Sequence, residues 1–122
     1  MLDFDCPSYT GGDGETANGS KKFVTVNGSR KEFTVFCHKG MYGSNIDIMT
    51  TMAFTMEDCM GDCANMNRVQ RNNTCVGVHF TANLDFAKAY ANKNCFMKGY
   101  LNGGKLQNDG SGDHVAAGVL VV

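Results

Sequence analysis

The chain has 122 residues, 43% of them hydrophobic and 19% charged, which predicts one folded domain over residues 1–122 and excludes global disorder. Eleven basic and twelve acidic residues give a net charge of −1, so we expect no nucleic-acid partner, because such binders carry an excess of positive charge. No apolar run approaches the roughly 18 residues that a membrane-spanning helix needs, and we expect no membrane insertion.

Residues 1–22 are predicted to form an N-terminal loop segment that Cys6 ties to the fold. Residues 7–20 consist almost entirely of turn-forming and polar residues, with little that a core could bury. The first six residues lack the basic and apolar regions of a secretion signal. We therefore expect that they begin a mature fragment, with Met1 added and the signal upstream.

The first regular structure expected along the chain is a β-hairpin. Residues 23–26 and 32–37 are rich in β-branched and aromatic side chains, and Asn27-Gly28 lies between them. This dipeptide tolerates the positive φ angles of tight hairpin turns. The two runs are therefore predicted to pair as antiparallel strands.

One helix is predicted to begin at Thr55 and to fray by residues 67–68. Its apolar positions recur at helical spacing on one face, and they are Met56, Cys59, Met60 and Cys63. Thr55 is a favourable N-cap, with Asp58 at the third helical position. Because Cys59 and Cys63 are four residues apart, both sulfur atoms should point toward whatever sheet covers the helix.

Three further strands are expected after the helix, over residues 76–80, 95–101 and 115–122. His79 can lie on either face of the first of these strands. If the strand already includes Cys75, His79 faces the helix with that cysteine; if it begins at Val76, the alternation puts His79 outside. The methionines near the helix are predicted to fill irregular gaps in the core; they are Met49, Met52, Met56, Met60 and Met66.

The six cysteines predict three disulfides and an extracellular location. The competing interpretation is a zinc site, but the chain lacks the C-x2-C and H-x3-5-H spacings that usually hold structural zinc. We expect no metal and no cofactor. Three glycosylation sequons begin at Asn18, Asn27 and Asn72, which fits a secreted glycoprotein.

The cysteine-bearing segments together resemble the PAN/Apple module over about residues 6–122, most closely its secreted fungal variety. The segments that carry the resemblance are Cys6-Pro7, Phe33–Cys37, Gly43–Ile48, Thr55–Ala64, Cys75–Phe80 and Asn94–Lys98. The resemblance implies an α+β fold, in which a twisted antiparallel sheet of about five strands cradles one helix and disulfides staple the two together. The segments between Cys75 and Cys95 and over residues 102–113 are longer than the family pattern.

The resemblance also implies the disulfide pairing, for which the cysteine count alone allows fifteen arrangements. The helix cysteines would bond to the two following strand cysteines in nested fashion. Carried over to this chain, Cys59 pairs with Cys95 and Cys63 pairs with Cys75. Cys6 and Cys37 then remain for the third bond.

A candidate ligand surface is predicted from aromatic and basic side chains that could stack on sugar rings or bind carboxylates. Its residues are Tyr90, Lys93, Lys98 and Tyr100, with Arg68 and Arg71 at the helix exit. If Cys95 faces the helix, Phe96, Lys98 and Tyr100 should share the opposite, uncovered sheet face. The alternative is that this face is an ordinary solvated one.

Enzymatic activity is not expected, because bridged cysteines leave no thiol nucleophile and no other catalytic motif is assembled. The leading hypothesis, taken from the resemblance, is a secreted recognition module that binds carbohydrate or a protein partner at a cell or cell-wall surface. One alternative is a secreted effector or inhibitor-like protein that acts on a single host protein. Another is an adhesion or assembly protein joined through strand edges, so we expect a monomer or a weak homo-oligomer.

Overall fold

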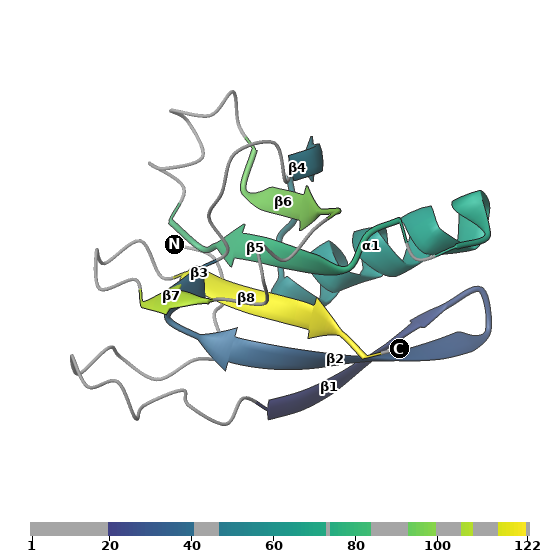
Figure 1. Ribbon diagram of the computed structural model, residues 1–122, viewed down its shortest axis with the longest axis horizontal. Coiled ribbons are helices and arrows are strands. Elements are labelled where there is room, and N and C mark those ends of the chain that lie inside the picture. Colours follow the sequence, from purple (N-terminus) through teal and green to yellow (C-terminus); the bar gives the residue numbers. More distant parts are fainter. Residues whose placement is uncertain are drawn as a thin grey trace.

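The structure is a computed structural model that describes residues 20–40, 47–72, 74–83, 93–99, 106–108 and 115–121. Its elements, in chain order, are β1 (Ser20–Val26), β2 (Ser29–Cys37), β3 (Lys39–Gly40), β4 (Asp47–Thr51), α1 (Met56–Gln70), β5 (Gly77–Thr81), β6 (Cys95–Lys98), β7 (Gln107–Asn108) and β8 (Val115–Leu120). Figure 1 shows this arrangement.

Six strands form one antiparallel sheet in the order β1-β2-β8-β5-β6-β4, and β3 pairs with β7 in a separate two-stranded sheet. The α+β class with one helix and an antiparallel sheet is therefore confirmed, with one more strand in the main sheet than expected. The additional strand is β4, at one edge of the sheet. The predicted boundaries shift in places: β1 begins at Ser20, inside the expected loop segment 1–22, and β6 ends at Lys98 rather than at residue 101.

The predicted hairpin is present. Strands β1 and β2 pair from Val26↔Ser29 to Ser20↔Val35, so that only two residues form the turn. Asn27 and Gly28 have φ angles of 52° and 81°, the left-handed conformation that a two-residue hairpin turn requires at both positions. The turn dipeptide therefore sets the register of the hairpin.

Helix α1 begins where it was predicted to begin. It ends at Gln70, two to three residues after the predicted end. The Thr55 hydroxyl accepts a hydrogen bond from the Asp58 N–H at 3.0 Å, as an N-cap does. At the other end, Arg71 adopts a left-handed conformation with φ 59° and its N–H bonds to the Asn67 carbonyl. The helix thus runs to Gln70, past the fraying expected at residues 67–68, because a left-handed C-cap closes its last turn.

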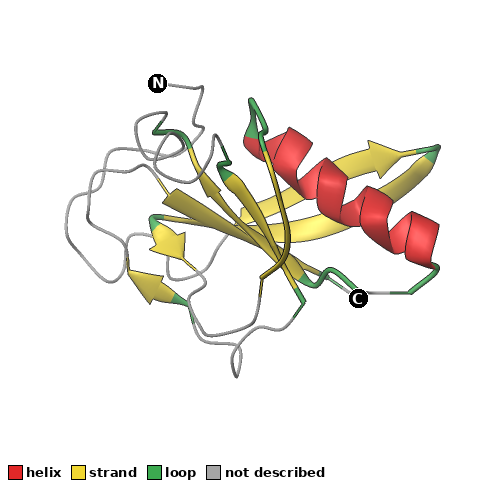
Figure 2. Ribbon diagram, turned by 90° about the horizontal axis from the view of Figure 1, so that it is seen from above, coloured by secondary structure: helices red, strands yellow, loops and turns green. Residues whose placement is uncertain are grey.

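Helix α1 lies across one face of the sheet (Figure 2). Its buried residues join strand side chains in one core; the largest of the fully buried apolar members are Phe33, Phe80, Met60, Met97 and Val78. Most of the predicted core methionines belong to this packing, but Met49 is 50% exposed on β4. Met49 is therefore a surface residue, because an edge strand has a neighbour on one side only.

Two disulfides join the helix to the sheet, and both are the pairs that the resemblance implies. Cys59 bonds to Cys95 and Cys63 bonds to Cys75, and all four residues are fully buried. Because Cys59 and Cys63 are one helical turn apart, both bonds leave the same face of α1. Cys37 is also disulfide-bonded, whereas its predicted partner, Cys6, lies outside the described residues.

The central strand β5 is buried on both faces of the sheet. Val78 and Phe80 face the helix, and His79, which is 5% exposed, lies on the other face with its ring edge-on to Phe96 at a centroid distance of 5.9 Å. The alternative that points His79 away from the helix is thus correct. The His79 side chain is nevertheless buried, so that this face of β5 is not a solvated surface at His79.

Two buried asparagines join segments that are far apart in the sequence. The Asn94 amide accepts from the Ala53 N–H and donates to the carbonyls of Ala53 and Thr81, at 2.8, 2.8 and 3.1 Å. The Asn67 amide brackets the backbone of Cys75, accepting from its N–H and donating to its carbonyl, both at 2.7 Å. Ala53 and Cys75 lie outside the strands and the helix, so these bonds satisfy backbone groups there that have no place in a strand ladder.

Candidate functional site

Among the described residues, a groove of about 650 Å³ lies between the hairpin and the C-terminal end of α1. In Figure 1 these two elements project at the same side of the molecule. The strand side of the groove is lined by Val26, Ser29, Arg30, Lys31, Glu32, Leu120 and Val121, and the helix side by Ala64, Asn67, Arg68, Arg71 and Asn72. We call it the basic groove.

The basic groove concentrates positive charge on a chain whose net charge is −1. Four of its lining residues are cationic, Arg30, Lys31, Arg68 and Arg71, and one is acidic, Glu32. Among the described residues, none of these four cations forms an ion pair, whereas Lys98 is paired with Asp47. A groove of this kind favours a ligand that carries negative charge.

Two of the four guanidinium and ammonium groups are held in place by neutral neighbours. The Arg30 guanidinium lies over the Phe23 ring, 3.8 Å from its centroid. The Arg68 Nε and Nη2 atoms both donate to Asn65 Oδ1, at 3.1 and 3.0 Å. Neutral partners fix these side chains without cancelling their charge. The side chains therefore lose less conformational entropy when a ligand binds.

The helix side of the groove is anchored to the sheet directly beneath it. Asn67 lines the groove and brackets the Cys75 backbone, and Cys75 is bonded to Cys63 one turn earlier in α1. The last turn of the helix therefore cannot move relative to β5 without breaking buried bonds. Arg68 and Arg71 consequently project from a fixed wall.

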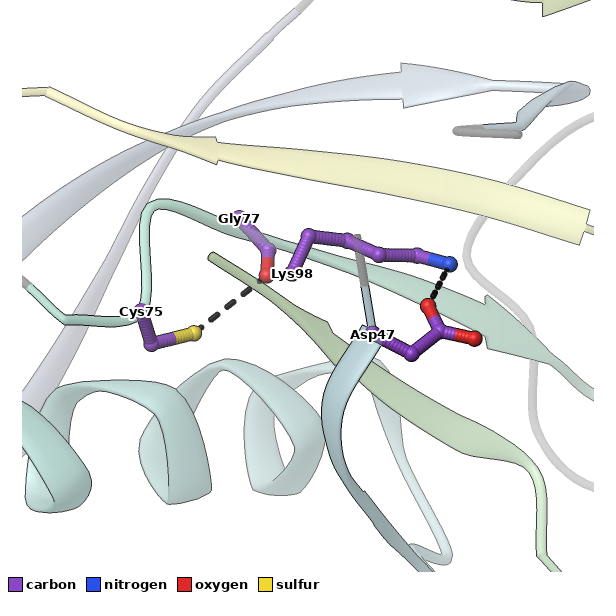
Figure 3. Close-up of polar contacts among 4 residues, drawn as sticks. All are labelled: Asp47, Cys75, Gly77 and Lys98. Atoms are coloured by element: carbon purple, nitrogen blue, oxygen red, sulfur yellow. Dashed lines mark hydrogen bonds and ion pairs between the residues drawn. The ribbon is translucent and has the colours of Figure 1, made fainter. Parts of the chain in front are cut away.

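The structure brings together two of the six residues predicted to contact a ligand, Arg68 and Arg71. Lys98 is not available: it is 5% exposed, and its ammonium group forms an ion pair with the Asp47 carboxylate (Figure 3). The prediction placed Lys98 correctly on the face away from the helix. It was wrong to treat that face as uncovered, because Phe96 and Lys98 are both buried there.

The Cys75 sulfur lies 3.3 Å from the Gly77 carbonyl oxygen, and Figure 3 draws this contact. Because this sulfur is bonded to Cys63, it carries no proton and donates no hydrogen bond. The contact is one of packing at the start of β5.

The other predicted site residues lie elsewhere. Lys93 is half-buried and does not line the basic groove. Tyr90 and Tyr100 lie outside the described residues. Of the glycosylation candidates, Asn27 is exposed in the hairpin turn and Asn72 is exposed at the edge of the basic groove. Asn18 lies outside the described residues.

Sequence reasoning missed Arg30 and Lys31. They lie two and three residues after Gly28 of the hairpin turn. This position could have indicated them, because basic residues beside a tight turn are held near the tip of a projecting element. That the hairpin tip lies next to the end of α1 depends on packing between β1 and the helix, which the local pattern does not contain. Val24 and Val26 provide that packing against the core.

Neither a metal cluster nor a membrane span is found in the described chain. Within the described ranges, no three His, Cys, Asp or Glu side chains lie close enough to hold a metal ion. No helix among these residues is long and apolar enough to cross a membrane. The cysteines of the two helix–sheet bonds are disulfides rather than zinc ligands.

Comparison with known proteins gives no match for this chain. No protein-family model matches it, and no curated protein or solved structure is significantly similar to it. The PAN/Apple assignment therefore stays a prediction.

Proposed function

We propose that the protein is a secreted, non-enzymatic recognition module of PAN/Apple type that binds a protein partner at a cell or cell-wall surface. The basic groove would be its binding site and an acidic segment of the partner its ligand. The observation that carries this proposal is the set of four cations without ion pairs on one groove with a single acid. The buried disulfides support an oxidising, extracellular compartment.

The lining of the groove favours an acidic peptide over a sugar. Proteins that bind neutral sugars stack aromatic rings on them, and none of the twelve described residues that line the groove is aromatic. The groove instead offers an apolar floor, contributed by Val26, Ala64 and Leu120, beneath a basic rim. An acidic peptide with apolar side chains matches both parts.

Two observations support a role in binding rather than catalysis. All five described cysteines are disulfide-bonded, so none of them can act as a nucleophile. The described histidines, His38 and His79, are both buried and neither lines the basic groove. The groove thus contains charge for recognition and no histidine or thiol for acid–base or covalent chemistry.

The test compares binding of two anionic probes to the folded, disulfide-bonded protein. Poly-glutamate represents an acidic peptide and polygalacturonate an acidic glycan, and binding is followed by fluorescence anisotropy. We expect poly-glutamate to bind, and we expect the double variant Arg68→Gln/Arg71→Gln to lose at least about tenfold in affinity. Each charge-assisted hydrogen bond is worth about 1.5 kcal/mol or more.

The matched control is Lys21→Gln/Lys22→Gln, which removes the same charge at the far end of β1, away from the groove. Equal losses in the two double variants would show that only net charge matters, and would refute the groove as the site. Binding of polygalacturonate without binding of poly-glutamate would refute the acidic-peptide ligand and indicate an anionic glycan instead. Failure of both probes would refute the proposal of an anionic ligand.

A further inference from the structure

Within the described residues, no strand pairs with the outer side of β4, which leaves this edge of the main sheet open. Strand β4 is the last strand in the sheet order, and in the described part of the chain it pairs with β6 only. An open edge offers backbone N–H and C=O groups to another strand. The opposite edge, β1, carries Lys21 and Lys22, and charged side chains are a usual protection against edge pairing.

Apolar side chains surround the open edge. Ile48 and Met49 of β4 are 41% and 50% exposed, and Val69 of α1 is 62% exposed. Beside the edge, on the helix side, lies a second groove of about 280 Å³ with the apolar residues Met49, Met66, Val69 and Met97 in its lining. We call it the methionine groove.

The size of the methionine groove indicates what it can hold. Pockets for drug-sized ligands are about 300–1,000 Å³ and enclose most of the ligand, so this smaller open groove suits one or two side chains. Methionines adapt their shape to such occupants. An occupant therefore has to supply an apolar side chain and, next to it, a strand that can pair with β4.

We propose that this occupant is β4 of a second copy of the chain, so that two molecules form a symmetric dimer through an antiparallel β4–β4 pair. A strand paired with its own copy about a two-fold axis centred on Met49 places Ile48 opposite Thr50. Asp47 lies beyond the register shift between Asp47 and Met49 and comes near Thr51 of the other copy. Met49 then lies opposite its own counterpart. The same patch serves both molecules, as in other two-fold interfaces.

The charges on β4 permit this pairing. Asp47 is the strand's only charged residue, and Lys98 of the same molecule forms an ion pair with it. In the proposed register the two Asp47 residues are four positions apart along the strands, or roughly 13 Å. This exceeds the Debye length of about 8 Å at physiological ionic strength, so repulsion between them is weak.

The pairing also covers the apolar surface beside the edge. Residues that face each other across an antiparallel pair lie on the same face of the sheet, and Met49 lies on the helix face, where it lines the methionine groove. Both copies of α1 therefore lie on one side of the joined sheet. The two methionine grooves meet at the seam, where each Met49 can enter the groove of the other copy.

The test is analytical sedimentation of the disulfide-bonded protein from micromolar concentrations up to about 1 mM. At about 1 mM, half of the chains are in dimers even if the dissociation constant is as weak as about 1 mM. We expect the mass to rise from one chain to two and to stop there. Met49→Lys places two like charges opposite each other and should weaken association at least about tenfold. Val69→Lys, on the exposed helix surface, is the second variant should the first fail to fold.

The matched control is Phe23→Lys, which adds the same charge at a residue of similar exposure, 43%, on the other edge strand. It should leave association unchanged. A single-chain mass at all concentrations would overturn the proposal. So would a dimer that Met49→Lys and Val69→Lys leave intact, or one that Phe23→Lys disrupts equally.

Discussion

Asn94 should be among the most costly residues to replace, although it is polar. Its side chain is fully buried and makes three hydrogen bonds, two to Ala53 and one to Thr81. Truncation in Asn94→Ala removes all three bonds, so that the Ala53 N–H loses its acceptor and the carbonyls of Ala53 and Thr81 each lose a donor. At about 1 to 1.5 kcal/mol for each bond, the free energy of unfolding should fall by about 3 to 5 kcal/mol.

The measurement is urea unfolding under non-reducing conditions, with the two variants Asn94→Ala and Asn94→Asp compared with the unchanged chain. Asn94→Asp keeps the shape and the acceptor for the Ala53 N–H, but it loses the amide donor that faces the carbonyls of Ala53 and Thr81. It should be at least as destabilising as alanine, because a carboxylate would be buried against two carbonyl oxygens. A loss below about 1 kcal/mol in both variants would refute this account of the three bonds.

Three further outcomes are expected from unfolding measurements. Replacing the Cys59–Cys95 pair by serines should lower the free energy of unfolding by about 4 kcal/mol, and replacing the Cys63–Cys75 pair should lower it by about 3 kcal/mol. In the chain-entropy model the first bond matters more because it closes a loop of 36 residues and the second a loop of 12. The reverse order would contradict that explanation. Asp47→Ala should destabilise more than Lys98→Met, since the first leaves a buried ammonium unpaired and the second leaves a half-exposed carboxylate in water; equal losses would show that the pair is solvated. Gly28→Val should cost about 1 to 2 kcal/mol, because φ is 81° there, and an unchanged midpoint would show that the turn rearranges freely.

Local signals predicted the elements that local contacts determine. The hydroxyl of Thr55 caps a helix that begins one residue later, and Asn27-Gly28 forms the turn that sets the hairpin register. Strand β4 was missed because its partner, β6, is more than forty residues away. Its sequence, Asp47–Thr51, also lacks a clear alternation of apolar and polar residues.

The burial of the second sheet face limited the prediction of the site. Alternation gives the face of Lys98 correctly but says nothing of what covers that face. Arg68 and Arg71 were predicted from their position at the helix exit, and they do line the basic groove. The hairpin half of the groove depends on where β1 packs on the helix, which is a long-range contact.

The exposed cations of the basic groove can change in sequence more freely than the buried residues beneath them. All four cations are exposed and none belongs to the hydrophobic core, while Asn67 and the Cys63–Cys75 bond beneath them are buried. Substitutions at exposed positions outside the core usually change stability by no more than about 0.5 kcal/mol. The chain can therefore acquire a different ligand preference by changing Arg30, Lys31, Arg68 or Arg71 while its fold stays the same, so that the evolution of binding and the maintenance of folding are largely independent.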